Sequence, residues 1–291
     1  MRSFLEFTAC IMRVVAAVVA FVMCQLVVLV ALELMGVNYD VYQGLFNTVY
    51  SVVLIGVFLL INHLRFWKKK SLTSFGKPEG YESIYAVIIA FGLLGVVSLY
   101  MICINLLSEV IPVLANELDK YSSSVDRYTN ISADEIPDWD HVINFFSTFM
   151  LIPFAEELVF RGIIFGELRE KFNLIWSAVI TALIFALMHG VSIQMGYAFA
   201  CGLVLALVYA FTDSIWVSYM VHAAFNLFGS SLATFMDSGI FGDLSELELQ
   251  YSAIMFEIEF VSILPMILVV VGLGREFPKQ HEEVNTLDEQ A

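Results

Sequence analysis

The chain has few charges and no cysteine motif. Only 15% of its 291 residues are charged, whereas 59% are hydrophobic, and the mean hydropathy is +0.82. This composition excludes an ordinary soluble domain. Its four cysteines have no CxxC spacing and fall within apolar stretches, which is typical of small buried residues rather than of zinc ligands or disulfides. There is no extended basic face, so the sequence gives no support for nucleic-acid binding.

The chain is rich in long apolar stretches. Segments of about 18 or more apolar residues indicate transmembrane helices. Because these segments are continuous rather than alternating, a membrane β-barrel is disfavoured and an all-α bundle follows. We predict a polytopic membrane bundle of about eight helices, at 10–35, 42–64, 83–107, 142–166, 174–190, 195–212, 215–236 and 251–273.

The basic residues orient this bundle. If both termini are cytoplasmic, twelve of the fourteen lysines and arginines lie inside, and only Lys120 and Arg127 lie outside. The sequence therefore predicts cytoplasmic termini and a multi-pass protein of a bacterial cell membrane. We interpret the acidic segments 108–141 and 237–250 as external loops. Residues 1–274 form one predicted transmembrane domain, with a functional core at about 142–230, and the polar tail 275–291 is predicted to be disordered.

Ionisable residues interrupt three of the predicted helices. The fourth span contains Glu156, Glu157 and Arg161, and since Glu157 and Arg161 are four residues apart on a helix, they can pair. Glu156 points about 100° away from Glu157. We assign Glu156 to chemistry and Glu157 with Arg161 to support. Taken alone, both acids could equally be residues of a helix end.

The next spans add imidazole and amide groups. His189 follows Phe185 by one turn, so the two can pack together, and Gly190 indicates a helix end. Glu156 and His189 are each 17 residues from the turn at 172–173, which would place them at one depth in a helical hairpin. His222 and Asn226 share a helix face. Each pair alone would most often be structural, but the combination favours a shared site.

This set fits peptide hydrolysis. Glu156 could take a proton from water that His189 orients, while His222 and Asn226 could donate hydrogen bonds to the oxyanion. No serine or cysteine of the set has an obvious base, which disfavours a covalent route. The rival chemistry is a zinc site formed by Glu156, His189 and His222, although the chain has no HExxH motif.

These residues resemble the CAAX-protease and bacteriocin-processing family of intramembrane proteases, also called the CPBP or Abi family. Its motifs EExxxR, FxxxH and HxxxN/D match Glu156–Arg161, Phe185–His189 and His222–Asn226 in order. The resemblance implies an eight-span bundle with a cavity open to the cytoplasm. It also implies that Glu156 and His189 activate water and that His222 and Asn226 form the oxyanion hole. The glutamate-dependent mechanism needs no cofactor, and a zinc-dependent one is the alternative.

The predicted function is therefore an intramembrane endopeptidase acting on a membrane-bound or amphipathic peptide or protein. The alternative is a non-catalytic membrane partner, such as a bacteriocin self-immunity protein or a modulator of a membrane sensor kinase. A proton-coupled transporter is disfavoured because the chain lacks repeat halves and paired helix breaks.

Overall fold

The computed structural model describes residues 2–68, 72–129, 136–190 and 192–288. Within these ranges the chain is helical, and the one β contact is an isolated bridge between Phe75 and Ser214. The predicted all-α membrane bundle is confirmed. The helices before the central region are α1 (Arg2–Leu34), α2 (Gln43–Lys68), α3 (Gly80–Ser108) and α4 (Pro112–Thr129).

The central and last helices carry the predicted functional residues. One continuous helical run comprises α5 (Asp138–Phe146), η2 (Ser147–Leu151), α6 (Ile152–Glu157), η3 (Leu158–Phe165) and α7 (Gly166–Arg169), with η marking π-helical segments. After α8 (Leu174–Met188) and α9 (Ile193–Thr212), a second run comprises α10 (Ile215–Asn226), η4 (Leu227–Ser231) and α11 (Leu232–Met236). The last helix is α12 (Ser245–Asp288).

In the part of the chain that the structure describes, six helical stretches are long and apolar enough to cross a membrane, whereas α8 is apolar but shorter. All eight predicted spans coincide with helical stretches. The chain is thus a multi-pass integral membrane protein. The count of eight and the side of the termini stay predictions.

Two sequence-based expectations need correction. The segment 108–141 is not only a loop, because it contains α4, an amphipathic helix whose polar residues hid it from a search for apolar spans. The polar tail was expected to be disordered from residue 275, but α12 continues to Asp288; residues 289–291 lie outside the described part.

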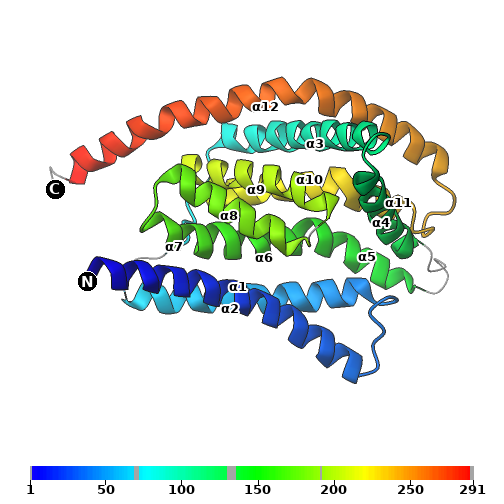
Figure 1. Ribbon diagram of the computed structural model, residues 1–291, viewed down its shortest axis with the longest axis horizontal. Coiled ribbons are helices and arrows are strands. Elements are labelled where there is room, and N and C mark those ends of the chain that lie inside the picture. The colour runs from blue at the N-terminus through cyan, green and yellow to red at the C-terminus, as the bar shows by residue number, and fades with distance from the viewer. Residues whose placement is uncertain (1, 69–71, 130–135, 191, 289–291) are drawn as a thin grey trace.

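The helices form three layers (Figure 1). Helix α12 packs along α3 on one side, the α1–α2 hairpin lies on the other, and α5 to α10 fill the centre. Close approach of α3 to α12 requires glycine, since a Cβ at Gly92 would meet the Met266 side chain and one at Gly95 would meet the backbone of Glu259. The central layer is thereby enclosed on two sides.

Polar contacts attach the α1–α2 hairpin to the centre. At the start of α2, the Asp140 carboxylate accepts hydrogen bonds from the backbone N–H groups of Gly44 and Leu45 at 2.8 and 2.9 Å. These N–H groups have no partner within their own helix, so Asp140 caps α2 from α5.

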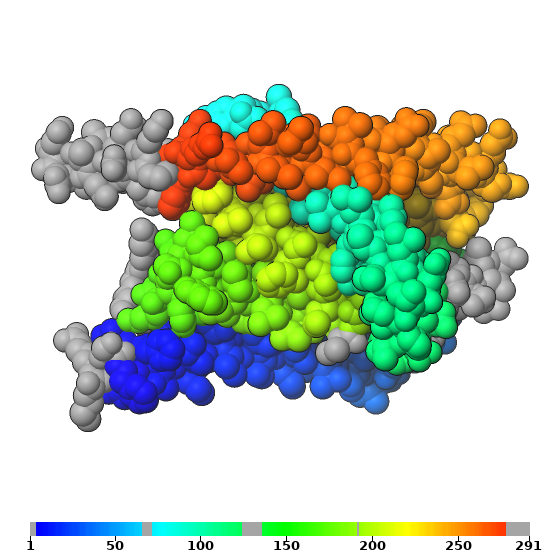
Figure 2. Space-filling model, turned by 45° about the horizontal axis from the view of Figure 1, so that its top comes forward, coloured from blue at the N-terminus to red at the C-terminus, as the bar shows by residue number. Residues whose placement is uncertain are grey.

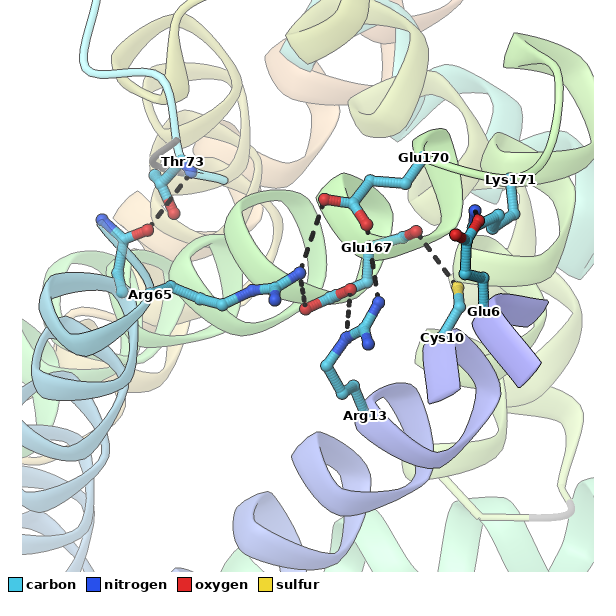
Figure 3. A network of polar contacts seen from close by, with 9 residues as sticks. Glu6, Cys10, Arg13, Arg65, Thr73, Glu167, Glu170 and Lys171 are labelled. Carbon is cyan, nitrogen blue, oxygen red and sulfur yellow. Dashed lines mark hydrogen bonds and ion pairs between the residues drawn. The ribbon is translucent and has the colours of Figure 1, made fainter. Parts of the chain in front are cut away.

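Glu167 makes the attachment at the other end of the hairpin (Figure 3). Its buried carboxylate lies 2.7 Å from Arg13 Nε of α1 and 2.6 Å from Arg65 Nη2 of α2. Glu170 contacts the same two arginines at 3.4 Å but is 39% exposed. Because water screens the outer acid and not the inner one, Glu167 should contribute most of the attachment.

These two acids provide a matched test of the hairpin attachment. We expect Glu167→Ala to lower the free energy of unfolding by about 2 kcal/mol or more, because it removes the buried partner of two arginines and leaves them only the more exposed Glu170. Glu170→Ala should cost less than about 1 kcal/mol. Thermal unfolding in detergent would check this, and equal losses for the two variants would contradict it.

Candidate functional site

The buried ion pair is the innermost part of the site. Arg161 Nη1 lies 3.0 Å from Glu157 Oε1, and both side chains are fully buried. Arg161 also donates a hydrogen bond to the Gly202 carbonyl at 3.2 Å, and its guanidinium lies 4.8 Å from the centre of the Phe185 ring. The pairing predicted from the spacing of four is confirmed. The guanidinium joins this helical run to α8 and α9.

His222 lies between the two glutamates. Its Nδ1 is 2.9 Å from Glu157 Oε1, and its Nε2 is 3.6 Å from Glu156 Oε2. The first contact favours a proton on Nδ1, because a carboxylate accepts and does not donate. Glu157 therefore orients His222 as well as neutralising Arg161, and Nε2 faces Glu156.

His189 comes from the end of α8. Helix α8 ends at Met188, and Gly190 follows with φ of +83°, a left-handed conformation that glycine adopts without strain. His189 Nδ1 is 2.9 Å from the Phe185 carbonyl oxygen, and the two rings lie 4.7 Å apart between centres. The predicted packing of Phe185 against His189 is confirmed. It leaves the Nε2 edge of the imidazole to face the cavity.

Asn226 is held by a π-helical segment. Its Nδ2 donates a hydrogen bond to the Thr148 carbonyl at 3.0 Å. Thr148 lies in η2, and Asn226 directly precedes η4. A π turn shifts the backbone hydrogen bonds by one residue and is frequent at functional sites. The amide group is thereby fixed in orientation, with a second N–H left on Nδ2.

One cavity of about 400 Å³ brings the four predicted catalytic residues together. Glu156, His189, His222 and Asn226 line it, as does Phe185. Glu157 and Arg161 do not line the cavity but contact its wall from behind, through His222 and Phe185. The remaining wall is mostly apolar and includes residues that the sequence gave no reason to single out: Leu94, Val97 and Met101 of α3, Tyr121 of α4, and Tyr197 of α9.

The central segment of the chain is similar to a known protein family. Residues 138–228 match the family of type II CAAX prenyl endopeptidase Rce1-like proteins. This segment contains all three motifs, and the resemblance seen in the sequence is confirmed. The fold and the site thus define a polytopic membrane protein with a polar cavity. Residues 138–228 are similar to the CAAX-protease family.

Two bacterial proteins are similar over part of this region. "Putative membrane peptidase YdiL" of Bacillus subtilis (strain 168) is 38% identical over 76 residues, which are 26% of this chain and 31% of that protein. "UPF0177 protein YxdF" of Lactococcus lactis subsp. lactis (strain IL1403) is 31% identical over 90 residues, 31% of this chain and 49% of that protein. The chain thus matches 31% and 49% of the lengths of these two relatives. No solved structure matches the chain significantly.

The geometry bears on the zinc alternative of Glu156, His189 and His222. Among the residues that the structure describes, no group of three His, Cys, Asp or Glu side chains is placed to hold a metal ion. His222 Nδ1 is already engaged by Glu157, and its Nε2 approaches a carboxylate oxygen. We therefore derive no step through a metal.

The ion pair gives a test of the site's framework. Arg161→Met should abolish most of the folded protein, because it leaves the Glu157 carboxylate buried without its counter-charge, at a cost of about 3–5 kcal/mol. Adding Glu157→Gln removes that charge and should restore much of the folded yield. Size-exclusion profiles of the detergent-solubilised variants would check this; an equally low yield for the double variant would contradict it.

Proposed function

We propose that this protein is an intramembrane endopeptidase that hydrolyses a peptide bond in a membrane-associated peptide or protein. One observation carries the proposal: Glu156, His189, His222 and Asn226 reach a single cavity from three separate helical stretches. Ionisable groups at membrane depth are costly and are usually functional. Similarity of the central segment to a peptidase family supports the same reaction.

Glu156 is the proposed general base. Its carboxylate is mostly buried but reaches the cavity, so it can accept a proton from a water molecule placed beside it. His189 presents Nε2 to the same cavity while its Nδ1 is held by Phe185. We assign His189 to orienting the attacking water.

His222 and Asn226 are the proposed oxyanion donors. His222 can donate from Nε2 only when both ring nitrogens are protonated, since Nδ1–H is directed at Glu157. A protonated His222 with Arg161 would balance the charges of Glu156 and Glu157, so this local set would be neutral. Preorganised donors of this kind stabilise the charge that develops on the carbonyl oxygen.

After attack by water, the proton taken by Glu156 can pass to the leaving amine. Atoms balance without a further reactant: water supplies the hydroxyl to the carbonyl carbon and the proton to the nitrogen. No cofactor is required in this scheme. The apolar remainder of the cavity wall would hold the substrate and limit competing water.

The first test replaces the base without changing its size. We expect Glu156→Gln to abolish cleavage, because an amide cannot accept the proton, while membrane insertion is retained. Peptides from membrane and secreted fractions of cells lacking the native gene, complemented with wild type or variant, would be compared by mass spectrometry. The matched control is Glu170→Gln, an identical change outside the cavity.

The outcomes separate the two functions. A peptide that is processed with wild type and Glu170→Gln, but not with Glu156→Gln, would establish proteolysis and identify a substrate. An unchanged peptide set, together with full rescue of the phenotype by Glu156→Gln, would point to the non-catalytic partner. Repeating the assay on purified protein after removal of divalent ions tests the metal-free scheme, which predicts an unchanged rate.

Asn226 allows a graded test of the oxyanion hole. Asn226→Ala should lower kcat by roughly 10²–10³-fold, as loss of one oxyanion donor typically does, with KM nearly unchanged. Asn105→Ala, which removes an exposed amide bonded only to its own helix at Met101, is the control. Wild-type kcat for Asn226→Ala would remove this residue from the proposed mechanism.

A further inference from the structure

The cavity occupies one half of the bundle. On α3 it is lined from Leu93 to Met101, in the half towards Ser108. On α9 it is lined mainly from Gln194 to Cys201, in the half that begins the helix. His189 lies at the end of α8. Since α3 and α8 run opposite to α9, all these positions lie towards the same end of the molecule.

The opposite half of the bundle is filled. Beyond Glu157, the helix that carries Glu156 continues with buried Phe160, Ile164 and Leu168. These side chains pack in a hydrophobic cluster that includes Tyr209 of α9 and Ile215 of α10. A packed hydrophobic cluster thus lies between the catalytic set and this end.

The two ends differ in charge. The filled end, where α1 begins and α12 ends (Figure 1), carries the cluster of Arg13 and Arg65 with Glu167, together with Arg169 and Lys171. The cavity end carries acids around α4 and before α12, namely Glu109, Glu117, Asp119, Asp237, Asp243 and Glu246. Lys120, on α4, is paired with Glu117 at 2.7 Å. Lysine and arginine accumulate on the cytoplasmic side of membrane proteins, so the filled end is the cytoplasmic one.

Helix α4 covers part of the cavity end. It lies against the start of α9, with the hydroxyl oxygens of Tyr121 and Tyr197 3.4 Å apart, and both tyrosines line the cavity. Figure 2 shows α4, in teal-green, over the end of the molecule away from the start of α1. The cavity lining thus includes side chains of α4 and of the start of α9, at the end that carries the acids.

We propose that the catalytic cavity is entered from the extracytoplasmic side of the membrane. If the proposed function holds, its substrate presents the scissile segment from that side, as an exported or outer-leaflet peptide does. This entry differs from the cytoplasmic opening that the family resemblance implies. Three observations support this entry side: the cavity lies in one half of the bundle, the other half is filled by packed side chains, and the two ends differ in charge.

Cysteine labelling tests the entry side without requiring activity. Cys10, Cys24, Cys103 and Cys201 would be replaced by alanine, and one cysteine introduced at Gln194 or Ser230 in the cavity. Asp243→Cys reports the cavity end and Lys77→Cys the other end; both positions are exposed. A membrane-impermeant maleimide is applied to right-side-out and inside-out vesicles, with labelling normalised to the detergent-solubilised protein.

We expect Gln194→Cys and Ser230→Cys to be labelled in right-side-out vesicles together with Asp243→Cys, with labelling lost in inside-out vesicles. Lys77→Cys should show the reverse. Labelling of the cavity positions only in inside-out vesicles, or from neither side, would overturn the proposal. If the labelling is as expected but the protein is inactive, only the proposed function is contradicted and the entry side stands. The two failures can therefore be told apart.

Discussion

The ion pair of Glu157 and Arg161 is the interaction on which the site depends. Two full charges inside an apolar bundle are tolerated only because each is the partner of the other. The pair then organises its neighbours: Arg161 contacts Gly202 and the Phe185 ring, and Glu157 holds His222. Three helices, α8, α9 and α10, are thereby attached to the helical run that carries the pair. The residues that line the cavity are positioned by residues that never reach it.

The π-helical segments lie beside the residues that direct an amide and a carboxylate, Asn226 and Glu156, into one cavity. In a regular α-helix, consecutive residues point about 100° apart, so few neighbouring residues can face the same cavity. Segments η2, η3 and η4 each alter that repeat next to a polar residue of the site. The Thr148 carbonyl in η2 accepts the Asn226 amide, and η3 starts directly after Glu157. The departure from regular helix is thus concentrated where the chemistry is proposed.

Much of this arrangement could be predicted from the sequence, because membrane depth makes charge informative. Lipid excludes irregular backbone, so apolar length predicts helices, and the i,i+4 spacing predicts the pairing of Glu157 with Arg161. Helix α4 was missed because an amphipathic surface helix has no apolar run. The role of Glu157 in holding His222 was also missed, since contacts between residues 65 positions apart depend on helix rotation, which π segments alter. The residues of α3 that line the cavity are all apolar, so nothing in their sequence marks them as part of a site.

The origin of the cavity walls has a consequence for how such proteins diversify. The polar residues belong to the segment shared with known relatives, residues 138–228. Part of the apolar wall is supplied by α3 and α4, through residues such as Leu94, Met101 and Tyr121, which lie outside that segment. Helices α1, α2 and α12 contribute no side chain to the lining found in the described residues. A lineage can therefore inherit the reactive groups unchanged and acquire a new selectivity by altering two helices that carry none of them.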